Sequence, residues 1–398
     1  MNVYYRKKNI VGDAYYRLGY DKFGPFLNGF MHWLREEFKK EKYDKVFFMS
    51  RDGYMMNVAN NFFQKTETLN LDFEYVYFSR NSLRRALLWT AKSYEESLKY
   101  IGYSKYLSFY ELMDYYGFDE AVVLEIAEKY KINCSTYFLY RDLNQNKVLQ
   151  AIYENYRDNI FEKSNARYQL VEKYIRQINM LGNVAIVDIG WNGTMQWCLE
   201  EIMRISGKKT VISGYYVGIS PVNGIQGKVV GYLYSNSKNR MRKELLCFFG
   251  VIETFFQCAE GATKDYISQN GKVIPVNGIY EYANESKIRK VLGNLQEGAM
   301  QYIMDKSQMK RMREFSHEDI KQFIQFGKNP TLKETKMFSF LFNMDGGKEF
   351  FLPQKSIFRY RTKEFLQAFS NSCWKTGFMK AAFKIPFPYY CVYEIVKK

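Results

Sequence analysis

The stretch Val184-Ala-Ile-Val-Asp188-Ile-Gly190-Trp-Asn-Gly193-Thr194-Met-Gln196 decides the fold of this 398-residue chain. Its four consecutive apolar residues are typical of a parallel strand that is covered on both faces. A carboxylate and two glycines follow this run, and helical spacing of apolar residues resumes at Met195, Leu199, Ile202 and Met203. The sequence therefore predicts a buried strand, a glycine-bearing turn and the start of a helix.

The turn at residues 190–194 has the features of an anion-binding site. Because the first N–H groups of a helix have no backbone partners, they favour an anion such as phosphate, and the helix dipole adds to this preference. Gly190 and Gly193 would let the backbone approach that anion closely, while Asp188 could hold hydroxyls or a metal ion. An ordinary strand-to-helix turn, in which the glycines serve only the backbone angles, explains the motif equally well.

Two further junctions repeat this pattern. The predicted strand at 45–49 leads into Ser-Arg-Asp-Gly at 50–53, and the predicted strand at 73–78 leads into Ser-Arg-Asn-Ser at 79–82. Ligands of open parallel sheets bind outside the carboxyl ends of the strands, and arginine can form two hydrogen bonds to phosphate oxygens. We therefore expect guanidiniums, hydroxyls and carboxylates along one edge of the sheet, although any single arginine could be a solvated surface charge.

Composition restricts the class of protein. A hydrophobic content of 47% excludes a disordered chain, and a net charge of +16 favours anionic partners such as phosphorylated substrates, nucleic acid or an acidic membrane surface. No signal peptide is visible in residues 1–15, and no apolar run reaches the roughly 18 residues that a spanning helix needs. These features predict a cytoplasmic protein, with a peripheral position at the inner face of the cytoplasmic membrane as a further option.

Cysteine and histidine chemistry is not indicated. The six cysteines lie far apart without a C-x-x-C pair, so neither a zinc site nor a disulfide framework is expected. His32 lies within an aromatic helical stretch and His317 at a polar helix start, so both are expected to be structural. A general base should therefore be an aspartate or a glutamate.

The sequence predicts an α/β fold with a mainly parallel sheet flanked by helices. Residues 1–280 are expected to form the α/β catalytic domain, and residues 281–398 a helical, basic C-terminal region. The segment 93–160 shows no convincing strand and is interpreted as a helical insertion that covers the site of a second substrate. Further elements are expected as helices at 21–40, 164–180 and 244–258, strands at 210–219 and 227–234, and a hairpin at 261–275 over the sheet edge.

The tail from Trp374 to Lys398 interleaves aromatic and basic residues. This pattern suits a contact with a membrane interface, and it equally suits a C-terminal helix that docks its apolar side on the domain. Pro386 and Pro388 are expected to limit any helix to the first part of the tail.

Several motifs also occur in an order and at a spacing known from one bacterial family: residues 19–20, 24–26, 33–34, 48–53, 79–80 and 188–196. Over about residues 15–280 the chain resembles the C-terminal part of a group labelled predicted haloacid-dehalogenase-like hydrolases in polysaccharide gene clusters. In the dual-domain ribofuranosyltransferases of that group, this part is a glycan phosphoribosyltransferase that uses phosphoribosyl pyrophosphate as its donor. A separate N-terminal phosphatase domain then removes the remaining 5-phosphate.

The chain departs from the usual layout of this group. The phosphatase half needs a strand that ends in D-x-D, and no predicted strand here ends so, because Asp188 is followed by Ile189 and Gly190. The resemblance thus implies a transferase of phosphoribosyl groups to a surface-polysaccharide hydroxyl, with a separate phosphatase polypeptide as partner. A haloacid-dehalogenase-like phosphatase and a non-catalytic scaffold of a glycan assembly complex are the alternatives.

The resemblance also implies roles for the turn residues. The donor carries a monophosphate and a pyrophosphate, so two anion-binding turns are needed. The expected donor-binding residues are Ser50, Arg51, Gly53, Arg80, Arg84, Gly190, Asn192, Gly193 and Thr194. Arginines or Mg²⁺ would absorb the charge of the leaving pyrophosphate, with Asp188 as the candidate metal ligand.

An acceptor hydroxyl would need a carboxylate base. Asp52 is the first candidate, followed by Asp188 and Glu253, although Asp188 could instead hold the ribose hydroxyls. Trp191 could stack on a sugar or fill the core. A glycan acceptor, expected to be lipid-linked, and a membrane surface complete the predicted partners, and nucleic acid is not expected because the basic residues form no recognisable binding signature.

Overall fold

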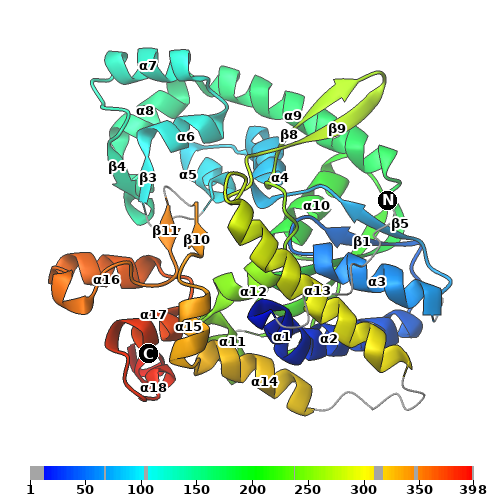
Figure 1. Cartoon of the computed structure of the whole chain (residues 1–398). Coiled ribbons are helices and arrows are strands. Elements are labelled where there is room, and N and C mark those ends of the chain that lie inside the picture. The colour runs from blue at the N-terminus through cyan, green and yellow to red at the C-terminus, as the bar shows by residue number, and fades with distance from the viewer. Residues whose placement is uncertain are drawn as a thin grey trace.

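The computed structural model describes residues 13–66, 69–102, 106–236, 238–308, 317–344 and 348–396. A five-stranded parallel sheet lies at the centre, helices cover both of its faces, and a largely helical C-terminal region follows (Figure 1). The predicted α/β class is therefore confirmed. Within these ranges, no helix combines the length and the apolar character that crossing a membrane requires.

The order of the strands changes direction between β1 and β5, the position at which doubly wound sheets generally form a crevice. The sheet runs β2-β1-β5-β6-β7 with every pairing parallel. From β1 the chain moves outward to β2, whereas β5 and its successors are added on the other side of β1. In such doubly wound sheets, ligands bind outside the carboxyl ends of the strands where this direction reverses. The strands are β1 (Lys45–Met49), β2 (Phe73–Val76), β5 (Gly182–Trp191), β6 (Thr210–Ile219) and β7 (Val229–Gly231).

Successive residues of each strand enter different hydrophobic clusters, as the alternation of side chains along a strand requires. Val46 and Phe48 pack on the face that carries α2 (Gly24–Lys40) and α3 (Tyr54–Thr66). Phe47 packs on the opposite face. The helices on that face are α4 (Arg80–Leu87), α9 (Arg157–Gln177) and α10 (Thr194–Ile205). Burial on both faces explains the continuous apolar runs in the sequence.

The insertion after α4 builds a hydrophobic cluster of its own, from Leu88 to Ile160. The prediction that it contains no strand is wrong, because β3 and β4 form an antiparallel pair within it. Strands of three residues are too short to give an alternating pattern. Its elements are α5 (Tyr94–Ser97), β3 (Tyr106–Ser108), α6 (Phe109–Tyr116), α7 (Glu120–Lys129), β4 (Tyr137–Leu139) and α8 (Lys147–Asn155).

The helix predicted at 244–258 is two helices, α11 (Arg240–Leu246) and α12 (Phe249–Phe256). The break lies where the C-terminal region docks: the Lys375 N–H donates to the Cys247 carbonyl over 2.7 Å, and the Gly250 N–H donates to the Cys373 carbonyl over 3.2 Å. Contacts between residues so distant in the sequence leave no local signal. The predicted hairpin is present as β8 (Thr263–Gln269) and β9 (Lys272–Asn277), and it packs on α9 and α4.

The C-terminal region packs directly on the first helices of the chain. A single hydrophobic cluster contains residues from Leu18 to Tyr393, and the rings of Phe26 and Phe323 stack with centroids 4.4 Å apart. The region consists of α13 (Ser286–Gln308), α14 (His317–Lys328), α15 (Leu332–Met337), β10 (Phe342–Asn343), β11 (Glu349–Phe350), α16 (Thr362–Asn371), α17 (Lys375–Phe383) and α18 (Tyr389–Val396). At the N-terminus, α1 (Ala14–Leu18) and a π-helical turn (Gly19–Phe23) precede α2.

The prediction that prolines limit the helix of the tail to its first part is wrong. Pro388 directly precedes α18, a position that proline tolerates because the first N–H groups of a helix lack partners in any case. Both helices of the tail dock on the protein, since Phe378 and Tyr390 are buried.

Candidate functional site

The three predicted carboxylates meet at the crevice between β1 and β5. Asp52 lies in the turn after β1, Asp188 near the carboxyl end of β5, and Glu253 on α12. The charge of Asp52 acts on both other carboxyls, and the charge of Glu253 acts on Asp188. The structure thus brings together residues that are 201 positions apart in the sequence.

Burial and mutual repulsion raise the pKa values of these carboxyls above those of free aspartate and glutamate. Burial, followed by the charge of Asp52, raises the pKa of Asp188 to about 8 and that of Glu253 to about 7. Burial also raises the pKa of Asp52, against the opposing effect of Arg51 and Arg80. Carboxyl groups that titrate near neutral pH are suited to accept and return a proton, and they cluster at functional sites.

One carboxyl oxygen of Asp188 accepts no hydrogen bond from the described residues. The residue pairs with Tyr216 across β5 and β6 and is 8% exposed. Its Oδ1 atom is buried without a hydrogen-bond partner in the part of the chain that the structure describes. Buried polar atoms are normally paired, so this oxygen is a candidate ligand for a cation or acceptor for a substrate hydroxyl.

The glycine-bearing turn after β5 is shorter than the sequence predicted. The strand continues to Trp191, so only Asn192 and Gly193 separate it from α10. A Cβ atom at Gly190 would lie 2.7 Å from the Gly218 carbonyl oxygen, and the φ of Gly190 is +106°. Gly190 is therefore required for packing against β6. Gly193, with a φ of +68°, directly precedes Thr194, the first residue of α10.

The three candidate arginines differ in their availability to a ligand. Arg51 donates to Glu281 over 2.7 Å and also to Gln257, so the protein itself occupies its guanidinium. Arg80 is exposed at the start of α4, and Arg84 follows one turn later with its Nε buried. Neither makes a hydrogen bond or ion pair to any side chain or backbone group among the residues described. These two arginines remain available to an anion.

Two other expected donor-binding residues hold the turn after β1 together. The Ser50 hydroxyl donates to the Phe78 carbonyl over 3.1 Å and so links the ends of β1 and β2. A Cβ atom at Gly53 would lie 2.6 Å from the Met49 carbonyl oxygen. The geometry thus gives Ser50 and Gly53 a structural role in positioning Asp52.

Three residues that the sequence did not assign to the site orient its charged groups. Glu281 and Gln257 fix Arg51, and Glu281 lies 230 positions away from it. The sequence left two roles open for Trp191, stacking on a sugar or filling the core. In the structure its indole N–H donates to Glu253 over 2.8 Å. No short motif could have revealed partners at such separations.

The described ranges contain no group of three His, Cys, Asp or Glu side chains arranged to hold a metal ion. Magnesium is commonly bound by one or two carboxylates together with substrate phosphates. The unsatisfied oxygen of Asp188 fits a contribution of that kind.

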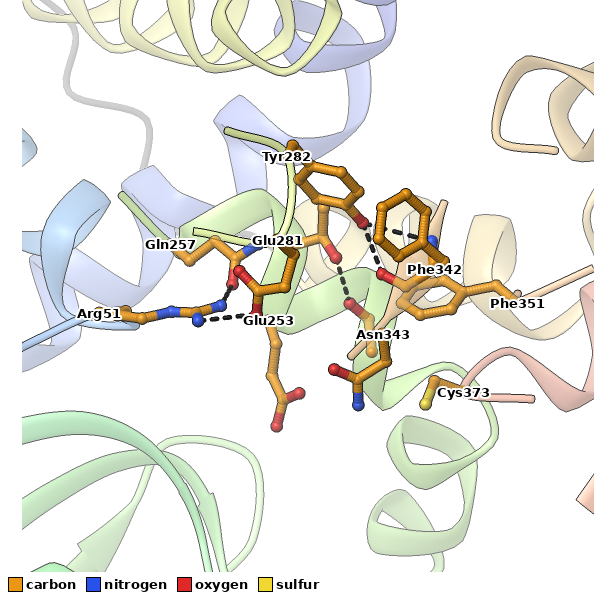
Figure 2. A pocket seen from close by; sticks show the side chains of 11 residues that line it. Arg51, Glu253, Gln257, Glu281, Tyr282, Phe342, Asn343, Phe351 and Cys373 are labelled. Carbon is orange, nitrogen blue, oxygen red and sulfur yellow. Dashed lines mark hydrogen bonds and ion pairs between the residues drawn. The ribbon is translucent and has the colours of Figure 1, made fainter. Parts of the chain in front are cut away.

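A pocket lies beside the carboxylates and is walled on one side by the C-terminal region. It holds about 320 Å³ of free space, part of it continuous with solvent. Figure 2 shows Arg51 reaching Glu281 and Gln257 on the left, and Phe351 and Cys373 on the right. Glu253 belongs to both the pocket and the carboxylate cluster. None of the site residues expected from the sequence lay beyond residue 280, so the contribution of the C-terminal region was not foreseen.

The chain matches no protein-family model and no curated protein.

Proposed function

We propose that this protein transfers a phosphoribosyl group from phosphoribosyl pyrophosphate to a hydroxyl of a surface-polysaccharide acceptor. The observation that carries the proposal is the meeting of Asp52, Asp188 and Glu253 with Arg80 at the crevice between β1 and β5. The identity of the donor rests on the ordered motifs, which resemble those of glycan phosphoribosyltransferases. The missing D-x-D motif disfavours a phosphatase.

The phosphates of the donor are assigned to the side of the site formed by α4 and α10. Of the three candidate arginines, Arg80 and Arg84 have no hydrogen-bond or ion-pair partner among the described residues. The charge of Arg84 acts on Cys198 on α10. The N–H groups at the start of α10, next to Thr194, add further donors for an anion. Mg²⁺ held by Asp188 and the phosphates would neutralise charge on the leaving pyrophosphate.

The acceptor hydroxyl would attack the anomeric carbon as the bond to pyrophosphate breaks, and its proton would pass to a carboxylate. Glu253 is the best-placed base, because it lines the pocket and the Trp191 N–H fixes one of its oxygens. A base whose pKa lies near 7 is matched to this task at neutral pH. Asp52 and Asp188 would then orient the ribose and the cation.

We also propose a peripheral contact with an anionic membrane, where a lipid-linked acceptor would reside. Phe383, at the end of α17, and Ile385 and Phe387, in its connection to α18, are 43%, 54% and 47% exposed. Residues 355–398 contain nine Lys and Arg against two Glu. Exposed apolar side chains among cations suit the interface of an anionic bilayer.

Calorimetric titration of the purified protein with phosphoribosyl pyrophosphate, with and without Mg²⁺, tests the central proposal. We expect Mg²⁺-dependent binding that is lost in Asp188→Asn and retained in Glu125→Gln, a control at an exposed carboxylate on α7. A uridine diphosphate hexose serves as the control ligand. Absence of donor binding to the folded protein, or equal binding to Asp188→Asn, would refute the transferase and favour a scaffold.

A further inference from the structure

We infer that the pocket between α12 and the β10–β11 hairpin binds the terminal sugar of the acceptor glycan. This inference rests on the proposed transferase function and assigns a binding site to its second substrate, the acceptor.

The walls combine the groups that bind a sugar. Amide and carboxylate side chains, which hydrogen-bond hydroxyls, are supplied by Gln257, Glu281 and Asn343, and aromatic rings are supplied by Tyr282 and Phe342. The Asn343 Oδ1 atom accepts from the Met344 N–H over 2.9 Å, and its amide nitrogen has no partner among the described residues.

The charge of the pocket argues against a phosphate. Among the described residues that line it, Arg51 is the only cation. Arg51 already pairs with Glu281 over 2.7 Å, and Glu253 adds a second carboxyl. A phosphate here would face two carboxyls and one neutralised guanidinium, whereas Arg80 and Arg84 lie outside this pocket. A neutral polyhydroxylated ligand meets no such repulsion.

The pocket lies next to the carboxylate cluster, so it can bring the acceptor to the proposed base. Glu253 lines the pocket and also interacts with Asp52 and Asp188. A sugar hydroxyl bound there would lie next to the proposed base, while the donor occupies the side of the carboxylates near α4 and α10. The two substrates would thus approach from different sides.

Hydrogen bonds and ring contacts within the protein hold the walls in place. The Tyr282 hydroxyl donates to the Phe342 carbonyl over 2.8 Å, and the two rings meet edge to face with centroids 4.8 Å apart (Figure 2). Arg51 ties residue 281 to the turn after β1. Such pre-organisation lowers the entropic cost of ordering the pocket's own side chains when a weakly binding sugar enters.

Saturation-transfer NMR with methyl glycosides of common bacterial hexoses and N-acetylhexosamines, with and without phosphoribosyl pyrophosphate, tests the inference. We expect at least one glycoside to receive saturation from the wild-type protein. This signal should fall at least fivefold in Asn343→Leu, which removes the amide, and in Asn343→Phe, which fills the pocket. Met344→Leu is the matched control on the same hairpin, since Met344 is 55% exposed.

Donor binding in the same variants separates this inference from the proposed function. Both Asn343 variants should bind phosphoribosyl pyrophosphate as the wild type does. Loss of donor binding in a folded Asn343 variant would show that the pocket holds the donor and would overturn the inference. Saturation that is absent from the wild type, or unchanged in both variants, would overturn it as well. Failure of the wild type to bind the donor would instead refute the proposed function.

Discussion

Asp188 and Glu253 link the proposed chemistry to stability. A carboxyl whose pKa rises on folding holds its proton more tightly in the folded chain than in the unfolded chain. Its favourable contribution is complete below the unfolded pKa of about 4 and is lost as the pH rises toward the folded pKa. Both carboxyls follow this rule, with folded values of about 8 and about 7. The site is therefore expected to destabilise the protein as the pH rises through neutrality.

The substitution Asp188→Asn should flatten this dependence. We expect the wild type to lose stability between pH 5.5 and pH 8, and the variant to be more stable than the wild type at pH 8 by on the order of 2 kcal/mol. Urea unfolding at both pH values measures the difference, with Glu125→Gln as the control. Parallel behaviour of wild type and Asp188→Asn would show that Asp188 ionises without a cost to folding.

Trp191 should tune the proposed base. Its N–H bonds to the Glu253 carboxyl over 2.8 Å and lowers the pKa of that group. In Trp191→Phe we expect the acid limb of the pH–rate profile for pyrophosphate release to move to higher pH, whereas Glu253→Gln should lower the rate by about 10² or more at every pH. An unshifted profile in Trp191→Phe would assign the indole to packing alone.

Some of the candidate site residues could be predicted from the sequence, and others could not. Asp52 and Asp188 could be predicted because each lies beside a glycine turn after an apolar strand, and Glu253 because it lies within an amphipathic segment. Glu281 and Asn343 could not be predicted, because their roles come from contacts across the fold that no local pattern encodes.

At the scale of elements, buried strands were the most predictable features. The bounds of β1 and β6 were predicted to the residue, because continuous apolar runs end at polar turns. The end of β5 was misplaced because Gly190 and Trp191, which resemble turn residues, pair with Gly218 and Ile219. Hydrogen bonding to a neighbouring strand overrode local propensity there.

The turn between β1 and α3 gives a test at this scale. In Gly53→Ala the new Cβ would lie 2.6 Å from the Met49 carbonyl oxygen and 2.8 Å from the Met49 nitrogen, so backbone would have to move. We expect a loss of about 2 kcal/mol or more in unfolding free energy. Gly293→Ala, at an open position in α13, should stabilise the protein by about 0.5–1 kcal/mol. Equal effects in chemical unfolding would contradict this reading.

At the scale of the whole molecule, the C-terminal region and the sheet share one core. The boundary predicted at residue 280 separates α13 from α1 and α2, with which it is in extensive contact. A fragment of residues 1–280 would expose the apolar partners of α13 and α14, Phe26 among them. We expect this fragment to show no cooperative thermal transition by circular dichroism. Cooperative unfolding of the fragment would establish an independent domain.

The proposed membrane contact also belongs to this scale. We expect the protein to sediment with phosphatidylglycerol vesicles and less with phosphatidylcholine vesicles, and raised salt should weaken the contact. The double substitution Phe383→Ser and Phe387→Ser should weaken binding by about tenfold or more, because two apolar anchors are lost. Ile279→Ser, at a residue that is 90% exposed and lies elsewhere, is the control. Equal weakening by both would indicate non-specific adhesion.

The ion pair between Arg51 and Glu281, which spans 230 positions, has a consequence for synthesis on the ribosome. The turn that carries Arg51 emerges early, but Glu281, which orients its guanidinium, appears only after the strands of the central sheet have been translated. The pocket wall at Cys373 follows later still. A nascent chain that lacks the C-terminal region therefore lacks an assembled site, and any activity would begin only after that region has been translated.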